Sequence, residues 1–327
     1  MIVITGQTGT GKTAYALKLA KKVNGELVNC DSRQIYKDLN IVTGKDLSPN
    51  CHFEEVKRLR NLDIGYFIIN DIPIWLYDIV KPSEPFSSYE YKLCALEAIS
   101  AIEVKGKVPI IVGGTYLYIR SLLYGFETEK IPPDWRLREI LEKLSVQKLQ
   151  EKLALLNPEE FDAMNNSDQN NPRRLMRKIE IIRHPELARL GEAPRRRVSG
   201  SPHRLSVVIP AKAGIQLNRS PIGVGDDIDF IALKFPDNAT MREVIGKRVM
   251  ERFENGAVEE TRELFEKGYK ETDPGLQTIG YKELIEYRKE NTSKDEMIQK
   301  WILAETKYAK RQHTFMKKDL KISWLTI

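Results

Sequence analysis

The sequence predicts an α/β protein with a parallel, doubly wound sheet and a largely helical second part. The first observation is a phosphate-binding loop at residues 6–13, between a strand and a helix. The second is the alternation of strand-like and helix-like segments up to Gly125. The third is a change after Asp134, where the pattern is helical to Arg183 with no clear strand.

The loop at residues 6–13 reads Gly-Gln-Thr-Gly-Thr-Gly-Lys-Thr and matches the pattern G-x-x-x-x-G-K-[ST]. Backbone N–H groups of such a loop cradle phosphates, while its Lys supplies charge and its Ser or Thr a hydroxyl for Mg²⁺. Lys12 and Thr13 occupy these two positions. Residues 1–4 read as a short buried strand, and residues 13–23 as a helix whose N-terminus faces the loop. This context argues against the alternative, a Gly-rich turn that matches by chance.

The loop predicts a bound phosphate without requiring a nucleotide. A P-loop hydrolase carries a carboxylate for Mg²⁺ at the end of another strand. The matching strand at residues 108–112 is followed by Gly113, Gly114 and Thr115, with no acid. The base-reading motif Asn-Lys-x-Asp of GTPases is also missing from the sequence. The phosphate can therefore belong to a substrate other than a nucleotide.

Length and composition predict a globular protein of two domains. The chain has 327 residues, enough for two full cores. It contains no apolar run of the roughly 20 residues that a membrane helix needs. The first strand begins at the first residue and leaves no room for a signal peptide, so a cytoplasmic location without membrane contact is expected. The cysteines and histidines are scattered and predict neither disulfides nor a metal site built by the protein; they are Cys30, Cys51, Cys94, His52, His184, His203 and His313.

Two further residues follow predicted strands at the edge where an open α/β sheet binds its ligands. Asp31 lies just beyond a strand at residues 26–30, where it can act on a ligand over the loop. A helix N-cap or a turn is the alternative role for this aspartate. Thr115 follows the strand at residues 108–112 and begins a helix at residues 116–123, where it can hydrogen-bond an anion. Residues 47–80 indicate only a strand that ends near Asp78.

Basic residues cluster in the second part of the chain. Arg173, Arg174 and Arg177 can share one helix face with Leu175 turned toward a core; a merely solvated face is the alternative. Residues 183–226 are rich in Pro, Gly, Ser and Arg, lack periodicity, and carry five of the six net positive charges. They read as a flexible linker or insert. Global charge is therefore weak support for RNA binding, which has to rest on local clusters.

Two helices near the C-terminus add cations at helical spacing. Arg248 and Arg252, in a helix near residues 241–255, are four residues apart and suit a multiply charged anion. Solvation, or pairing with Glu251 and Glu259, is the alternative. The last helix is amphipathic with a continuous basic face, a typical RNA-binding pattern. That face consists of Lys307, Lys310, Arg311, Thr314, Lys317 and Lys318.

Several stretches together resemble the tRNA dimethylallyltransferases, also called isopentenyl-diphosphate:tRNA transferases or the IPP transferase family. They are residues 6–13, 31–37, 112–115, 173–177, 276–283 and 310–312, in the family's order. A P-loop alone is unspecific, whereas this combination is highly specific. The resemblance covers most of the chain outside residues 47–80 and 183–226.

This resemblance implies a fold, a reaction and partners. The fold is a P-loop NTPase-like core of residues 1–126 and 228–327, with an all-helical domain, residues 127–227, inserted into it. The reaction transfers a dimethylallyl group from dimethylallyl diphosphate to N6 of the adenosine 3′ of the anticodon (position 37 of the tRNA). Its products are N6-isopentenyladenosine and diphosphate. The implied cofactor is Mg²⁺, the partner is the anticodon stem-loop of tRNA, and we expect a monomer.

The resemblance also implies roles for individual residues. Asp31 would be the base, Thr115 would donate to the bridging oxygen, and Lys12 would complete the catalytic set. Diphosphate would be bound by Gly6, Gln7, Thr8, Gly9, Thr10, Gly11, Lys12, Thr13 and Arg252, with Mg²⁺ held through Thr13. The tRNA would be bound by Asp31, Ser32, Arg33, Gln34, Arg173, Arg174, Leu175, Met176, Arg177, Thr278, Gly280, Tyr281, Lys310, Arg311 and Gln312.

The chain also departs from the family's pattern. Gln7 replaces the usual proline of the loop, residues 41–46 match the Gly-Thr-Ala-Lys-Pro segment only loosely, and a histidine pair before Asp78 is missing. These changes bear on the prenyl pocket. The insert at 183–226 looks like a translated mobile repeat, so deletion of residues 186–224 should leave turnover intact. A large loss of turnover would contradict that hypothesis.

Two functions of other classes stay open at this point. A P-loop kinase for a nucleoside or small molecule would need ATP, and it gives no role to the basic C-terminal helix. A non-catalytic RNA-binding protein with a decayed P-loop conflicts with the intact Lys12, Thr13 and Asp31.

Overall fold

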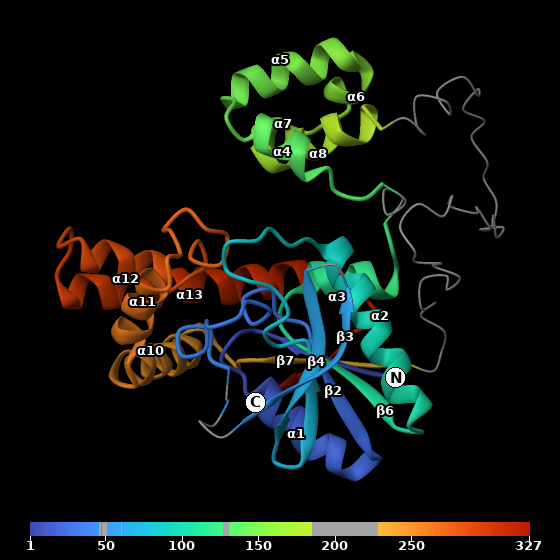
Figure 1. Cartoon of the computed structure of the whole chain (residues 1–327), viewed down its shortest axis with the longest axis vertical. Coiled ribbons are helices and arrows are strands. Elements are labelled where there is room, and N and C mark those ends of the chain that lie inside the picture. The colour runs from blue at the N-terminus through green and yellow to red at the C-terminus, as the bar shows by residue number, and fades with distance from the viewer. Residues whose placement is uncertain (46, 48–50, 60, 127–130, 185–227) are drawn as a thin grey trace. The chain divides into compact units, whose positions relative to one another are not determined.

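The structure is a computed structural model that describes residues 1–45, 47, 51–59, 61–126, 131–184 and 228–327. The chain divides into two compact units (Figure 1). The core unit consists of Met1–Gly125 and Pro221–Ile327, and the helical unit of Phe126–Ser220. The predicted basic insert at 183–226 lies almost entirely outside the described residues.

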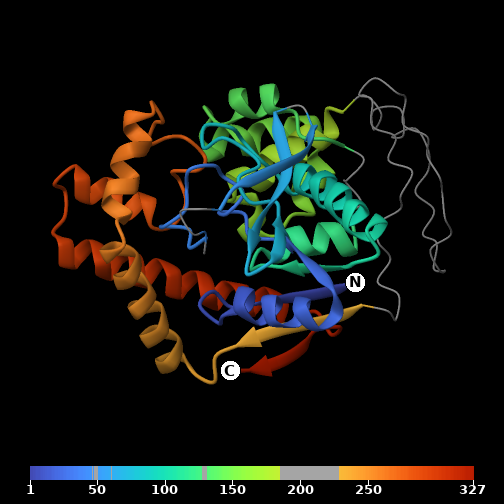
Figure 2. The same ribbon diagram turned by 60° about the horizontal axis from the view of Figure 1, so that its bottom comes forward.

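The core unit is built on an eight-stranded sheet. Its strands are β1 (Ile2–Gly6), β2 (Gly25–Asn29), β3 (Phe53–Leu59), β4 (Leu62–Ile69), β5 (Ile72–Trp75), β6 (Val108–Val112), β7 (Asp229–Lys234) and β8 (Ser323–Thr326). Their order in the sheet is β3-β4-β5-β2-β6-β1-β7-β8. The pairs from β5 to β8 are all parallel, and Figure 2 shows β7 and β8 at one edge. The central strands β1, β2 and β6 are largely buried, as strands covered on both faces must be, although β2 contains the polar residues Glu26 and Asn29.

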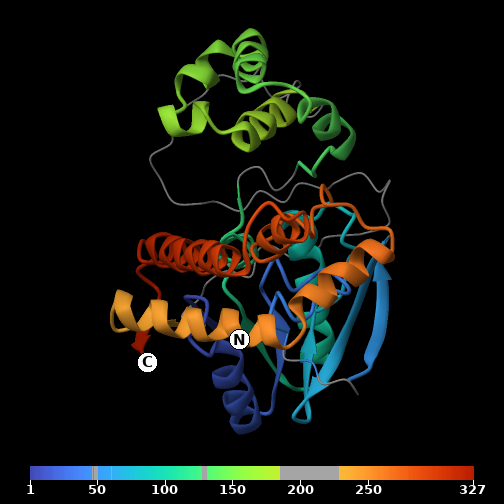
Figure 3. The same cartoon turned by 90° about the vertical axis from the view of Figure 1, so that its left-hand side faces the viewer.

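Helices cover both faces of this sheet and also pack beside it. They are α1 (Lys12–Val23), α2 (Ser88–Val104), α3 (Tyr116–Leu123), α10 (Asn238–Glu254), α11 (Ala257–Glu266), α12 (Tyr281–Arg288) and α13 (Lys294–Met316). Ala16 and Ala20 of α1 pack on Ile4, Leu27 and Ile110 of one sheet face. Right-handed crossovers place α2 and α3 on the opposite face, because β2→α2→β6 runs against the direction of β1→α1→β2. Helices α10 to α13 pack on one another beside the sheet (Figure 3).

The helical unit contains α4 (Trp135–Leu141), α5 (Val146–Leu156), α6 (Pro158–Asp162), α7 (Asn166–Gln169) and α8 (Pro172–Ile182). Asp134, Ser145, Asn157, Asn165 and Asn171 each cap the N-terminus of one of these helices with a side-chain oxygen. Leu141, Leu149, Leu153, Leu175 and Ile179 form its core. This unit is therefore held by its own apolar core and caps.

The predicted α/β fold with a parallel sheet and a helical part is confirmed. Three strands were not predicted. The antiparallel pair β3–β4 falls in the segment that gave no clear pattern, and β8 is a short, exposed edge strand at the C-terminal end. The strand expected to end near Asp78 is β5, which ends at Trp75. In the described part of the chain, no helix is long and apolar enough to cross a membrane.

Candidate active site

The candidate site lies at the carboxyl edge of the parallel strands. The P-loop connects β1 to α1, Asp31 follows β2, and Gly113 to Thr115 follow β6. These segments meet around a cavity of about 290 Å³. It is lined by Thr8, Gly9, Gly11, Lys12, Thr13, Ala14, Asp31, Arg33, Gln34, Thr43, Gly44, Val112, Gly113, Arg248 and Arg252. The fold thus places the P-loop beside Arg248 and Arg252, which lie more than 200 positions away in the sequence. A ligand site at this edge is expected for an open α/β sheet.

Gln7 anchors the P-loop to the neighbouring strand. Its backbone N–H donates to Leu233 O at 3.1 Å, and its side-chain Oε1 accepts from the Phe235 N–H at 3.0 Å. Its carbonyl oxygen accepts from Thr10 Oγ1 at 2.8 Å and from Lys12 Nζ at 2.7 Å. The buried Gln7 side chain therefore faces the protein interior, and Gln7 supports the loop from behind.

Gln312 of α13 ties the P-loop to the turn after β6. Its Oε1 accepts from the Thr8 N–H at 2.7 Å, and its Nε2 donates to Gly114 O at 2.8 Å. A Cβ at Gly114 would lie 2.1 Å from Gln312 Nε2, so this close contact requires a glycine at position 114. Gln312 is only 5% exposed. The resemblance assigned this residue to the tRNA, but its side chain is committed to two backbone groups of the site.

Asp31 and Thr115 organise the segment after β2. Asp31 Oδ1 accepts from the Arg33 N–H at 3.0 Å, which is the turn that the sequence left open as an alternative role. Thr115 Oγ1 accepts from the Ser32 N–H at 2.9 Å and is 3.1 Å from Ser32 Oγ. Asp31 nevertheless lines the cavity, so it shapes the turn and also faces the site.

Cations dominate the cavity wall. Burial is the main cause that lowers the pKa of Lys12 to about 7, opposed by the charge of Asp31. Arg252 is buried, and burial together with the charge of Arg248 lowers its pKa to about 10. Arg252 Nη1 is 3.4 Å from Glu305 Oε1, so its carboxylate partner is neither Glu251 nor Glu259. A site with this excess of buried positive charge favours a multiply charged anion.

The site offers few ligands for a metal ion. Among the described residues, no three His, Cys, Asp or Glu side chains are grouped as a metal would require. Thr13 and Asp31 both line the cavity and supply one hydroxyl and one carboxylate. This donor set fits Mg²⁺, which takes one or two protein oxygens and completes its shell with water and substrate phosphates.

Some residues assigned to the tRNA are exposed. Lys310 and Arg311 lie on the exposed face of α13 with Lys307 and Thr314, as predicted, although the helix ends at Met316, before Lys317 and Lys318. In the helical unit, Arg173 and Arg174 are also exposed at the start of α8. These side chains form accessible basic surfaces, in which Arg174 is paired with Asp168.

Other residues assigned to the tRNA are used inside the protein. Leu175 and Met176 belong to the core of the helical unit. Arg177 pairs with the buried Glu180 and donates to Ile131 O at 2.8 Å. Gln34 Nε2 donates to Gly44 O at 2.9 Å, and Thr278 Oγ1 donates to Gly275 O at 2.9 Å. Tyr281 is buried with its hydroxyl on Glu260, and Gly280 before it is buried as well.

Sequence reasoning missed two acids of the core unit. Glu260 accepts the N–H groups of Asn40, Ile41 and Val42 and thereby holds the segment beside the cavity. Glu305 pairs with Arg33 as well as with Arg252. The signal for Glu305 was its position on the same helix face as Trp301 and Ala309, where a charged residue is out of place.

Comparisons with known proteins identify the family of this chain. The family model described as IPP transferase matches residues 34–319. A tRNA dimethylallyltransferase of Thermoanaerobacter sp. (strain X514) is 32% identical over 333 residues, covering 100% of this chain and 91% of the relative. The corresponding enzyme of Finegoldia magna is 33% identical over 331 residues, covering 100% and 90%.

Solved structures show the same similarity. The tRNA isopentenylpyrophosphate transferase of Bacillus halodurans has a TM-score of 0.62 at 27% identity, covering 99% of this chain and 89% of that one. The enzyme of Staphylococcus epidermidis has a TM-score of 0.61 at 30% identity, covering 99% and 92%. With a matching family model and full-length relatives above 30% identity, this chain belongs to the IPP transferase family.

Proposed function

We propose that this protein transfers the dimethylallyl group of dimethylallyl diphosphate to N6 of the adenosine 3′ of a tRNA anticodon. The relatives of matching length are named tRNA dimethylallyltransferases. The observation that carries the proposal is one cavity in which the P-loop, Asp31, Arg248 and Arg252 converge. A tRNA substrate leads us to expect the reaction in the cytoplasm, and we propose that the protein acts as a monomer.

The cavity suits the departing diphosphate. In the reaction the C1–O bond of the allylic diphosphate breaks, and negative charge builds on the leaving oxygens. Preorganised donors aimed at that charge are the largest usual contribution to catalysis. Here the P-loop amides, Lys12 and Arg252 are those donors, with Arg248 beside them. Mg²⁺ bound through Thr13 would supply further positive charge to the leaving group when present.

Asp31 suits the acceptor side of the reaction. The bond that forms joins N6 of adenine to C1 of the dimethylallyl group, and N6 then loses a proton. The exocyclic amine is a poor nucleophile, so a positioned carboxylate that accepts its hydrogen bond or proton assists attack. Asp31 and Lys12 both line the cavity. Thr115 and Ser32 are not among its lining residues, but Thr115 accepts the N–H of Ser32, the neighbour of Asp31 in the chain. We propose that Thr115 donates to the bridging oxygen from this position.

The exposed basic surfaces suit the tRNA. We propose that Lys310 and Arg311 contact the phosphates of the anticodon stem, and that Arg173 and Arg174 of the helical unit do so as well. The adenosine must leave the stack of the anticodon loop before it can react, at a cost of about a few kcal/mol. Because phosphate contacts release counterions, tRNA binding should weaken steeply with salt. We further propose that residues 127–227 act as an inserted tRNA-binding domain.

The first experiment is incubation with dimethylallyl diphosphate, Mg²⁺ and an unmodified tRNA, followed by mass analysis of its nucleosides. The expected result is a dimethylallyl mass gain on the adenosine beside the anticodon. That gain should disappear in Lys12→Ala and Asp31→Ala and persist in Lys18→Ala and Asp71→Ala, matched controls at the surface. No mass gain with tRNA still bound would indicate a decayed enzyme, and ATP turnover without RNA would move the protein to the kinases.

A further inference from the structure

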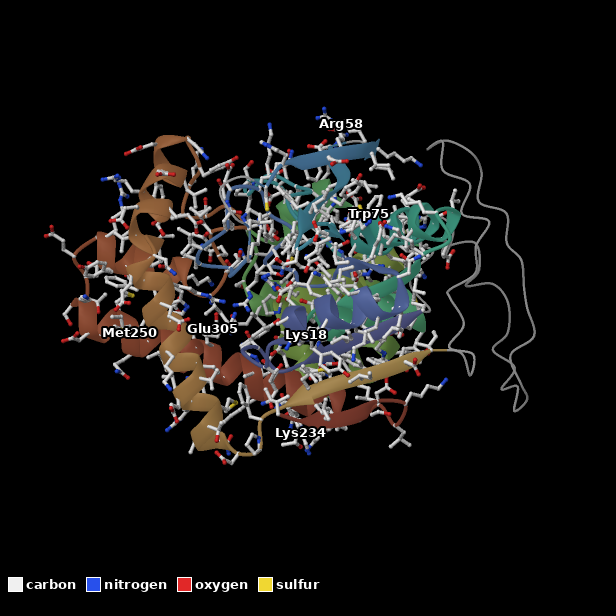
Figure 4. All side chains as sticks on the ribbon, turned by 90° about the horizontal axis from the view of Figure 1, so that it is seen from below. Lys18, Arg58, Trp75, Lys234, Met250 and Glu305 are labelled. Carbon is white, nitrogen blue, oxygen red and sulfur yellow. The ribbon has the colours of Figure 1, made fainter. Side chains whose placement is uncertain are left out.

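Glu305 is a buried acid that contacts two arginines of the cavity. It lies in the middle of α13, is 2% exposed, and faces the interior between α13 and α10 (Figure 4). Its Oε1 accepts from Arg33 Nη1 at 2.8 Å and lies 3.4 Å from Arg252 Nη1. Its second oxygen, Oε2, is buried without a hydrogen-bond partner among the described residues. Burying a carboxylate in this way costs free energy unless the carboxylate is paired with cations.

The two arginines reach Glu305 from separate segments. Arg33 follows β2, while Arg252 lies in the last turn of α10. The Arg33 guanidinium is stacked 4.9 Å from the ring centroid of Tyr308, and its Nε is 3.7 Å from Asp31 Oδ1. Arg252 is packed so closely on Gly44 that a Cβ there would lie 2.4 Å from its Nη2. Both arginines nevertheless line the cavity.

Without Glu305 these cations would repel one another at short range. Burial acts to lower the pKa of Arg33, but the carboxylates of Glu305 and Asp31 outweigh it and raise that pKa. Arg252 is farther from Glu305, and burial together with the charge of Arg248 lowers its pKa. Glu305 itself stays charged, because Arg33 and Arg252 lower its pKa although burial opposes this. The carboxylate is therefore an anionic link between two cations in a region of little solvent screening.

We propose that Glu305 is a positioning residue that holds Arg33 and Arg252 on the cavity wall, so that both guanidiniums face the diphosphate. Glu305 does not line the cavity, so it acts through the arginines. The inference rests on the proposed function in one respect, that this cavity binds a diphosphate. It extends that function by naming Arg33 as a second positioned cation and Glu305 as the group that orders both.

Simple electrostatics makes the opposite prediction. If Glu305 were only a negative charge near the site, its removal would strengthen the binding of an anion. If it positions the arginines, its removal weakens that binding even though the net charge becomes more positive. The sign of the change in affinity therefore separates the two roles.

The experiment is calorimetric titration of the full-length protein with inorganic diphosphate in the presence of Mg²⁺. Glu305→Gln removes the charge and points an N–H₂ group at one arginine. Glu305→Asp keeps the charge but withdraws the carboxylate by about one C–C bond, roughly 1.5 Å. We expect the Kd to rise by about tenfold or more in both variants, as hydrogen bonds to charged groups warrant. Glu296→Gln, the same change on the exposed first turn of α13, should leave the Kd unaltered.

The binding results test the positioning role of Glu305 and the diphosphate site separately. Tighter or unchanged binding in folded Glu305→Gln overturns the positioning role. If that variant does not fold, Glu305→Asp decides in the same way, since unchanged binding there also overturns it. No binding to the unsubstituted protein would refute the diphosphate site itself, and with it this inference. In turnover with tRNA, Glu305→Asp should raise the KM for dimethylallyl diphosphate more than it lowers kcat, which a general loss of packing would not do.

Discussion

Replacing Gln312 with leucine tests whether α13 holds the P-loop or reads tRNA at this position. Leucine has a similar size but no polar atoms, so the Thr8 N–H and the Gly114 carbonyl would both lose their partner. Both backbone groups belong to buried residues. The phosphate-binding loop would then lose its link to the turn after β6.

The loss of stability can be estimated from the two hydrogen bonds that Gln312 makes. Each buried group left without a partner costs about 1–3 kcal/mol, so the free energy of unfolding should fall by about 2–6 kcal/mol. For a unit of this size, about 1 kcal/mol shifts the Tm by roughly 2–4 °C, which predicts a fall on the order of 10 °C. The affinity for inorganic diphosphate should fall as well, since the loop amides are no longer preorganised.

The assay is thermal unfolding without tRNA, together with diphosphate titration and a filter-binding measurement of tRNA affinity. Lys310→Gln is the matched control on the exposed face of the same helix. It should weaken tRNA binding and leave the Tm and the diphosphate affinity unchanged. If Gln312→Leu instead behaves like Lys310→Gln, with normal Tm and normal diphosphate affinity, then Gln312 contacts the tRNA and the reasoning from burial is refuted.

Three other predictions concern pH, a glycine and salt. Because Lys12 has a pKa of about 7 and only its protonated form attracts diphosphate, the Kd of the free protein should rise by up to about tenfold per unit above pH 7; titrations from pH 6 to 9 should show this rise, and a flat profile would contradict it. Gly44→Ala should displace Arg252 and lower the affinity for diphosphate, since the new Cβ meets its guanidinium and the φ of 67° disfavours alanine by about 1 kcal/mol. Gly268→Ala is the control, because Gly268 also has a positive φ but has open space around it, and it should leave the affinity normal. Lys310→Gln combined with Arg311→Gln should reduce the slope of log K for tRNA against log salt by about 1–2; an unchanged slope would remove α13 from the tRNA-binding surface.

Much of the core unit could be predicted from local sequence patterns. The strands β1, β2, β6 and β7 each contain a short apolar stretch next to turns or helices, and such stretches are typical of strands buried on both faces. The antiparallel β3 carries exposed side chains at five of its seven positions, so it lacks an apolar run. The strand β8 lies at the other edge of the sheet and is exposed at three of its four positions. It therefore lacks a buried apolar run as well.

The candidate site was predicted only in part. The P-loop, Asp31 and Thr115 were found because each follows a strand in the chain, and strand ends of a parallel sheet meet at one edge. Arg248 and Arg252 were found from their helical spacing, but their spacing left open which acid pairs with them. For Arg252 the acid is Glu305, 53 positions away, which also pairs with Arg33 at a separation of 272 positions.

The phosphate-binding loop, the α/β class, the family resemblance and the basic outer face of α13 could all be predicted from the amino-acid sequence. These depend on residues that are close in the chain or on motifs in order. Tertiary packing determines which polar side chains of α13 face inward, where Gln312 binds the P-loop and Glu305 links two arginines. The reason is physical. A buried polar group must find its partner within hydrogen-bond distance, and the fold chooses that partner without regard to distance along the chain.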